Sequence, residues 1–184
     1  MTCIVGYLSD NRIYMGGDSA GVAGLNIRER SDEKVFIKGN MIFGFTSSFR
    51  MGQLIRYNLT IPKHRPDEKA DYEYMCTDFI DAVISCFKNN GYARINSNEV
   101  DGGTFLVGYR NSLYKIESDF QVGRLADPYD ACGCGEYYAM GAIKVYHENK
   151  NLIGLSDKDV VEETLKTVVK FSAGVRDPFT ILSI

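Results

Sequence analysis

Two short stretches near the start of the chain have the pattern of β-strands: residues 2–8 are rich in β-forming apolar residues, and in residues 12–16 the apolar Ile13 and Met15 alternate with their neighbours. A period of two is typical of β-strands with one buried face. Ser9-Asp10-Asn11, between the two stretches, consists of residues that favour turns. The pattern therefore predicts a β-hairpin that begins at Thr2.

The next apolar stretches predict a second hairpin and a short helix. Residues 34–38 and 41–46 are rich in β-forming apolar residues, and Gly39-Asn40 between them is a possible turn. Apolar residues at helical spacing then predict an amphipathic helix over about 49–58. It should end before the polar segment 62–71, whose two prolines and several charges indicate a loop.

A helical period takes over in the middle of the chain. Apolar residues recur at this spacing from Tyr72 to Phe87, and Asn89-Asn90-Gly91 ends the run. Two strands are expected next, over 103–109 and 113–117, on either side of a tight turn at 110–112.

The last third of the chain predicts two more helices and one strand. After a loop that reaches Gly135, apolar positions over 137–145 fit a helix. Ser156 stands three positions before an aspartate, as in a capping box, and apolar residues of 161–169 share one face of the helix behind it. Residues 179–184 have the pattern of a final strand.

Strands and helices thus come in blocks rather than in strict alternation. This order favours an α+β fold over a doubly wound parallel sheet. The chain has 184 residues, within the usual size range of one domain, and no repeat or linker divides it. We therefore expect a single α+β domain over residues 1–184.

Composition and charge narrow the class of protein. The hydrophobic fraction of 45% and the charged fraction of 24% are ordinary for a globular domain. A net charge of −3 without a basic patch argues against nucleic acid as a partner, and no apolar run is long enough to span a membrane. Five cysteines, an odd number without a secretion signal, favour reduced thiols and a cytoplasmic location.

The cysteines and histidines form no metal-binding pattern. Cys132-Gly133-Cys134 lacks a second Cys/His pair at finger-like spacing, and His64 and His147 are isolated. Cys3 follows Thr2, but alternation along a strand turns it to the opposite face, which predicts a core thiol. Neither a metal nor a cofactor is expected.

Three of the first 34 residues carry candidate catalytic groups. Thr2 is small enough for Met1 to be removed, which would expose its α-amine. Threonine with a free α-amine is a nucleophile that needs no histidine, because the amine accepts the hydroxyl proton. A nearby ammonium such as that of Lys34 would lower the amine pKa from its usual value of about 7.7–8.0, and a carboxylate such as that of Asp18 would hold the ammonium in place.

Thr2, Asp18 and Lys34 are separated by 16 residues each (2 to 18 and 18 to 34). This spacing resembles the Thr/Asp/Lys triad of proteasome β subunits and of the bacterial HslV peptidase subunit. The resemblance implies the four-layer αββα sandwich of the N-terminal-nucleophile hydrolases. Five segments carry it in the family's order: 2–6, 16–19, 41–48, 133–142 and 176–180.

The resemblance also implies roles for these residues. The hydroxyl of Thr2 would attack the scissile carbonyl with its own amine as the general base. Lys34 would tune both groups electrostatically, and Asp18 would orient Lys34. The backbone N–H of Ser48 would stabilise the oxyanion of the reaction.

Three more residues, Cys134, Asp177 and Thr180, are expected to support the nucleophile. Cys134 stands where the family usually has a serine that binds the terminal amine, and a thiol is a weaker hydrogen-bond donor. Ser48 departs from the family in the same way, because it stands where glycine is preferred. Its side chain should narrow the cleft, while its backbone donor survives.

The resemblance implies a threonine endopeptidase that cuts protein or peptide substrates inside a homo-oligomeric ring, fed by an ATPase that unfolds them. Two other functions stay open. If Met1 is kept, Thr2 has no free amine, and the chain is a proteasome-like shell or interaction protein. The same site also suits an amidase or a peptide ligase.

Overall fold

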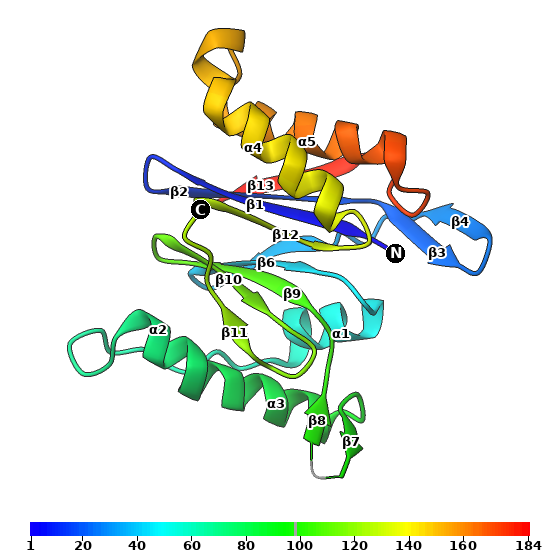
Figure 1. Ribbon diagram of the computed structural model, residues 1–184. Helices are drawn as coiled ribbons and strands as arrows, with labels where there is room; N and C mark the ends of the chain where they lie inside the picture. Colours follow the sequence, from blue (N-terminus) through cyan, green and yellow to red (C-terminus); the bar gives the residue numbers. More distant parts are fainter. Residues whose placement is uncertain (98) are drawn as a thin grey trace.

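Two antiparallel sheets are stacked face to face at the centre of the molecule, and helices cover the outer face of each (Figure 1). This computed structural model describes residues 1–97 and 99–184. The four layers are those of an αββα sandwich, which confirms the predicted α+β class and the architecture that the family resemblance implies.

The first sheet has the strand order β12-β1-β2-β13. The predicted N-terminal hairpin, β1 (Cys3–Ser9) and β2 (Arg12–Asp18), forms its centre. β12 (Tyr129–Gly133) pairs with β1 on one side, and β13 (Phe179–Ser183) pairs with β2 on the other.

The second sheet has the order β11-β10-β9-β6-β5. Its strands include the two other predicted hairpins, with a short fifth strand at one edge. Their bounds are β5 (Val35–Lys38), β6 (Met41–Phe45), β9 (Phe105–Tyr109), β10 (Ser112–Ile116) and β11 (Val122–Gly123).

The two helical layers come from separate parts of the chain. α4 (Glu136–Ile153) and α5 (Asp157–Phe171) lie against the first sheet (Figure 1). α5 begins with the predicted capping box, because the Ser156 and Asp159 side chains each bind the backbone N–H of the other. The second sheet is covered by α1 (Phe49–Gln53), η1 (Leu54–Asn58), α2 (Asp71–Tyr74), η2 (Met75–Phe79) and α3 (Ile80–Asn89).

Alternation along β1 divides its side chains between two cores. Cys3, Val5 and Tyr7 pack into the cluster shared with the helices α4 and α5. Ile4 points the other way, into the cluster between the two sheets. Both faces of β1 are therefore buried, and the predicted core position of Cys3 is confirmed, with none of its surface exposed.

The sequence prediction of a loop reaching Gly135 is wrong, because that segment contains β11 and β12. β12 was hidden by Asp130, a charged residue inside a five-residue strand that also ends in glycine. Such a strand has little of the apolar alternation that identifies strands in a sequence.

Two small hairpins also lie outside the predicted elements. β3 (Ala20–Ala23) and β4 (Asn26–Glu29) form one, and β7 (Arg94–Asn96) and β8 (Glu99–Asp101) form the other. Their side chains are largely exposed, so burial imposes no pattern on them. In addition, the second half of the predicted helix over 49–58 is a π-helix rather than an α-helix.

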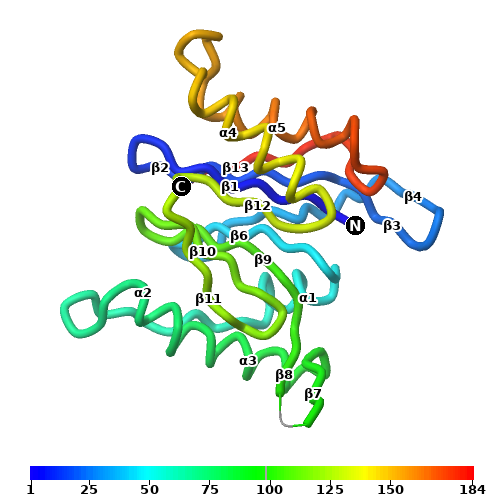
Figure 2. The backbone as a smooth tube through the Cα atoms, viewed as in Figure 1, coloured from blue at the N-terminus to red at the C-terminus, as the bar shows by residue number. Residues whose placement is uncertain are grey.

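Figure 2 shows the N-terminus where β12 passes into α4, at one end of the sandwich. A backbone hydrogen bond from Gly135 N–H to the Thr2 carbonyl oxygen, 3.4 Å long, fixes this meeting. Within the described residues, no helix combines the length and apolar character that crossing a membrane requires.

Candidate active site

Asp18 and Lys34 form an ion pair that is almost sealed from water. Lys34 Nζ lies 2.9 Å from Asp18 Oδ1, and the two side chains are 1% and 0% exposed. Asp18 ends β2 in the first sheet, and Lys34 directly precedes β5 in the second, so the pair bridges the two sheets. Burial lowers the pKa of Lys34, and the Asp18 carboxylate opposes that shift.

The Asp18 carboxylate also fixes the backbone beside Thr2. Its Oδ1 accepts a hydrogen bond from Cys3 N–H at 3.0 Å, and its Oδ2 accepts one from Ala20 N–H at 2.9 Å. A single carboxylate thus connects the ammonium of Lys34 to the residue that follows Thr2. The three residues predicted as a triad converge at one end of the sandwich.

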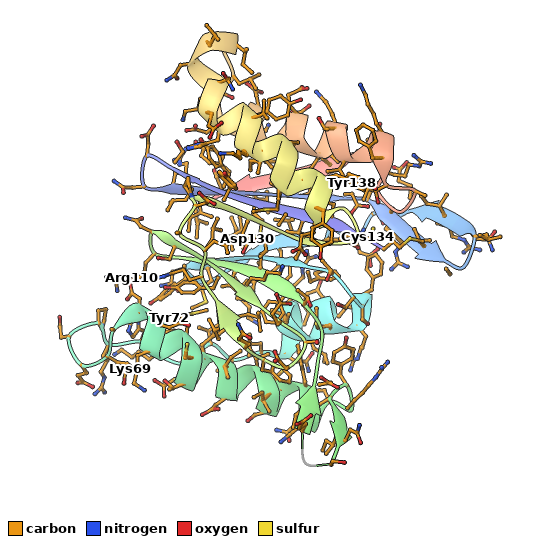
Figure 3. All side chains as sticks on the ribbon, in the orientation of Figure 1. Lys69, Tyr72, Arg110, Asp130, Cys134 and Tyr138 are labelled. Carbon is orange, nitrogen blue, oxygen red and sulfur yellow. The ribbon has the colours of Figure 1, made fainter. Side chains whose placement is uncertain are left out.

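The backbone of Thr2 is held from the other side by Cys134 (labelled in Figure 3). Thr2 N–H donates to Cys134 Sγ at 3.3 Å, and the thiol donates to the Thr2 carbonyl oxygen at 3.4 Å. The Ser172 hydroxyl lies 3.4 Å from the same sulfur. Cys134 thus contacts the nitrogen of Thr2, and its supporting role at a free amine stays a prediction.

Met1 covers the hydroxyl of Thr2 in this form of the chain. Thr2 Oγ1 donates to the Met1 carbonyl oxygen at 2.5 Å, and Thr2 is only 6% exposed. The Met1 side chain packs against Gly174, where a Cβ atom would lie 2.2 Å from Met1 Cβ. The nitrogen of Thr2 is therefore a peptide nitrogen here, and it cannot accept a proton.

β12 comes this close to Thr2 because Gly133 has no side chain. Gly133 has φ +102, a conformation that other residues rarely adopt, and a Cβ atom there would lie 2.2 Å from the Thr2 carbonyl oxygen. The glycine brings Cys134 and Gly135 onto Thr2.

Ser48, the expected oxyanion donor, lies in a tight turn. Its N–H donates to the Thr46 carbonyl oxygen at 2.6 Å, across Ser47 with φ 62. Its side chain accepts from Arg50 N–H and caps α1. To reach a substrate, the Ser48 N–H has to leave the Thr46 oxygen, so this predicted role needs a local change of backbone.

An aromatic and a guanidinium form the adjacent wall. The Arg30 guanidinium lies 4.2 Å from the centre of the Phe49 ring, and Lys34 Nζ lies 5.8 Å from it. Arg30 is held there by a 2.6 Å ion pair with Asp32. The Phe49 ring therefore lies within cation–π range of both positive side chains.

Among the residues that the structure describes, no group of three or more His, Cys, Asp or Glu side chains could hold a metal ion. Cys3 and Cys132 are buried, and burial raises the pKa of both thiols far above the usual value. These two cysteines serve as small apolar core residues.

No protein-family model matches the chain, and no curated protein matches it either. Solved structures do. BPH of Thiobacillus denitrificans in complex with epoxomicin matches with a TM-score of 0.79 at 16% identity, over 100% of this chain and 98% of that one. A second structure of Thiobacillus denitrificans BPH matches with a TM-score of 0.78 at 16% identity, over 100% of this chain and 97% of that one. Eukaryotic HslV from Trypanosoma brucei gives 0.70 at 14% identity, over 99% and 98%.

The chain has the proteasome β-subunit fold. At 14–16% identity this similarity concerns the fold and leaves the chemistry to the residues of this chain. Within the proteasome-type fold, the described site lies where β12, β1 and the segment before β5 meet.

Asp177 and Thr180, the two expected supporting residues near the end of the chain, lie near this end of the proteasome-type fold. Neither side chain makes a direct hydrogen bond to Thr2. Asp177 contributes its carbonyl oxygen, which accepts from the Ser19 hydroxyl at 2.9 Å. Thr180 stands opposite Gly17 in the β13–β2 pairing. Their supporting roles remain predictions.

Sequence reasoning missed Ser172 and Ser19. Ser172 is the C-cap residue of α5, and the sequence placed the helix end one residue later, at Ala173-Gly174. Ser19 directly follows Asp18 and binds both Arg176 and Asp177 carbonyl oxygens. No local periodicity identifies either serine, because both partners are far away in the sequence.

Proposed function

We propose that this chain is a threonine-type peptidase whose nucleophile is Thr2 once Thr2 carries a free α-amine. One observation carries the proposal: the buried Asp18–Lys34 ion pair, anchored to the backbone next to Thr2. Burying two charges costs free energy unless they are paired and hydrogen-bonded, so a pair at this place calls for a functional reason.

The chemistry follows from the atoms around Thr2. After loss of Met1, the Thr2 nitrogen becomes an amine beside Cys134 Sγ, and Thr2 Oγ1 loses its bond to the Met1 oxygen. The amine takes the hydroxyl proton as Oγ1 attacks the substrate carbonyl, and then returns it to the leaving amine. The Lys34 ammonium favours the neutral, basic form of that amine. Water then hydrolyses the acyl-enzyme.

The proposal extends to assembly and substrate. BPH and HslV have the same fold, and proteasome-like proteins form oligomeric rings. The helices suited to packing between subunits carry exposed aromatic residues: Tyr72 is 44% exposed, Tyr137 87% and Tyr138 48%. We therefore expect a homo-oligomeric cytoplasmic ring that acts on peptides or unfolded protein, with an ATPase as a possible partner.

Intact mass spectrometry tests the proposal. BPH is described in complex with epoxomicin, so epoxomicin is the probe. The purified protein should lack Met1 and gain one covalent adduct, and Thr2→Ala should gain none. A mass that retains Met1, with no adduct, would contradict the peptidase in this form of the chain.

The contacts that Met1 makes motivate a second candidate function, a proteasome-like shell or interaction protein. Its motivation is the packing of Met1 on Gly174 and the bond from Thr2 Oγ1 to the Met1 oxygen. A third, an amidase or peptide ligase on the same site, differs in the acceptor of the acyl group. Short fluorogenic peptides with and without an added amine separate hydrolysis from ligation.

A further inference from the structure

The first sheet of the sandwich ends in the edge strands β12 and β13, and the second ends in β11 and β5. An edge strand presents backbone N–H and C=O groups that can pair with another chain, and natural proteins usually block or shorten such edges. In this molecule β12, β11 and β5 are each blocked or short, whereas β13 is neither.

The edge of β12 is blocked by one of its own side chains. Leu8 N–H donates to the Pro128 carbonyl oxygen at 2.6 Å, and alternation from this pair directs the backbone groups of Ala131 away from β1. The Asp130 carboxylate accepts from Ala131 N–H at 2.7 Å. An incoming strand therefore finds this outward donor occupied.

The edges of the second sheet are protected in other ways. Phe45 N–H donates to the Lys34 carbonyl oxygen, so alternation directs the carbonyl group of Val35 outward. Arg56 Nη2 donates to the Glu33 carbonyl oxygen at 2.8 Å and to that of Val35 at 3.5 Å. Arg56 thus covers β5, and β11 is only two residues long.

The outer edge of β13 is open. Ile13 and Ile184 exchange two backbone hydrogen bonds, 3.0 and 3.1 Å long. Alternation from this pair directs the N–H and C=O groups of Phe179, Ile181 and Ser183 away from β2. Among the described residues none of these groups has a hydrogen-bond partner, and the whole strand is only half-buried. β13 therefore offers a ladder of three residues to a further strand.

The spacing of these outward groups fits an identical strand. Two antiparallel strands exchange both hydrogen bonds at every second residue. A second β13 with Ile181 opposite Ile181 therefore pairs Phe179 with Ser183 at each end of the ladder. Every outward N–H then meets a C=O, and the arrangement has the two-fold symmetry that is commonest among homo-oligomers.

The position of α5 relative to this two-fold axis follows from the ladder. Figure 1 shows α5 above β13. Gly16 stands opposite Ile181, and a Cβ atom at Gly16 would lie 2.5 Å from Val161 and 2.9 Å from Leu165. An axis through Ile181 therefore passes close to this turn of α5, and it sets the α5 helices of two copies antiparallel.

The charges of α5 beside the edge are complementary under the same rotation. Glu162 and Lys166, one turn apart, both line a groove of about 400 Å³ between α5 and the start of β13. The rotation brings Glu162 of each copy toward Lys166 of the other. Lys166 already pairs with Glu162 and Glu163 of its own helix at 2.8 Å, so the second copy extends an existing charge network.

We propose that two copies of this chain pair through β13, antiparallel and about a two-fold axis at Ile181, so that their first sheets form one continuous sheet. The open edge specifies an extended backbone as its partner. The fit of the outward groups to themselves, together with the charges of α5, selects a second copy. The inference does not depend on the proposed peptidase activity, because the outer edge of β13 is open whatever Thr2 does.

Disulfide trapping tests the register in a Cys76→Ser, Cys134→Ser background, which removes the exposed thiols of the described chain. Ile181→Cys should cross-link two copies under mild oxidation, because facing residues of a hydrogen-bonded pair have Cα atoms about 5.5 Å apart, within disulfide range. Ser183→Cys is the matched control. Its mate lies four residues away along the ladder, roughly 13 Å, so it should stay unlinked alone and cross-link only with Phe179→Cys.

A proline variant tests the contact without cysteines. Ser183→Pro removes an outward N–H and puts a ring into the seam, whereas an edge strand tolerates proline on its open side. Sedimentation velocity should give an assembly mass of about half that of the parent, with thermal unfolding still cooperative. Ile37→Pro, at an outward position of the edge that Arg56 covers, should keep the parent mass.

Three results would each overturn the proposal: no cross-link in Ile181→Cys, an equal cross-link in Ser183→Cys alone, or the parent mass in a folded Ser183→Pro. A monomeric parent would overturn it as well, and would leave the edge to an extended segment of a different protein. The epoxomicin adduct reads Thr2 separately, so failure of the contact and failure of the peptidase are distinguishable.

Discussion

The thiol of Cys134 lies 3.3 Å from the backbone nitrogen of Thr2. Because Cys134 is exposed, N-ethylmaleimide should alkylate it and place a bulky group against Thr2. We therefore expect alkylation to prevent the epoxomicin adduct, as measured by intact mass. Cys134→Ser should resist N-ethylmaleimide. It should react with epoxomicin at least as fast as the parent, because a hydroxyl is a stronger hydrogen-bond partner for the Thr2 nitrogen than a thiol.

The control is Cys76→Ser, since Cys76 is the other exposed cysteine of the described chain. This variant should stay sensitive to N-ethylmaleimide. If N-ethylmaleimide prevented the epoxomicin adduct equally in Cys134→Ser and in the parent, alkylation of Cys134 would not be the cause of the loss.

Asp18→Asn should cost both stability and reactivity. It leaves the Lys34 ammonium buried without its counter-charge, and breaking a buried pair on one side costs about 3–5 kcal/mol. Urea unfolding measures the loss, and the epoxomicin reaction should fall below detection. Asp32→Asn breaks the half-exposed pair with Arg30 and should cost about 0–1 kcal/mol. Similar losses for the two variants would contradict the special position of Asp18.

Asp130→Asn should change the pH dependence of stability. The folded protein holds the Asp130 proton up to a pKa of about 6, whereas the reference value is 3.8. The folded state is therefore favoured at low pH, and this contribution is lost as pH rises from about 4 through 6. Asparagine avoids burying the charge, so the variant should be more stable than the parent by about 1–3 kcal/mol at pH 7.5.

At pH 3.5 the same substitution should give no gain, because Asp130 is then protonated in both states. Chemical unfolding of parent and variant across this range measures the difference. A constant difference at every pH would assign the effect to packing rather than to the charge. Asp67→Asn, on the surface, should show no such dependence.

Gly133→Ala should displace Thr2. The new Cβ would meet the Thr2 carbonyl oxygen at 2.2 Å, in addition to the strain of φ +102. Gly24→Ala is the matched control, since Gly24 has φ +58 with no atom within 4 Å of the added Cβ. We expect the free energy of unfolding to fall by about 1 kcal/mol in the control and by clearly more in Gly133→Ala. Only Gly133→Ala should also lose the epoxomicin adduct.

Elements with local signals could be predicted from the sequence. The hairpin of β1 and β2 has β-forming residues on both sides of a turn signal, the capping box at Ser156 needs only an acidic residue three positions later, and both are confirmed. The meeting of Thr2 with Asp18 and Lys34 was predictable only through the resemblance to proteasome β subunits, since the spacing alone does not bring three residues together.

The rest depends on contacts between distant parts of the chain or on local backbone angles that the apolar pattern does not reveal. That Ser172 reaches Cys134 follows from the docking of α5 on the first sheet. The bond of Ser48 N–H to Thr46 depends on the positive φ of Ser47, which is not evident in the apolar pattern. The charge of Asp130 concealed β12, although this strand ends in Gly133 and leads directly into Cys134, which binds Thr2.

The bridge between Asp18 and Lys34 has a consequence for how the chain matures. Asp18 ends a strand of one sheet and Lys34 adjoins a strand of the other, so neither sheet can form the pair alone. An unfinished or partly opened chain has no charged centre beside Thr2. If Thr2 is the nucleophile, as we propose, its reactivity therefore requires correct stacking of the two sheets.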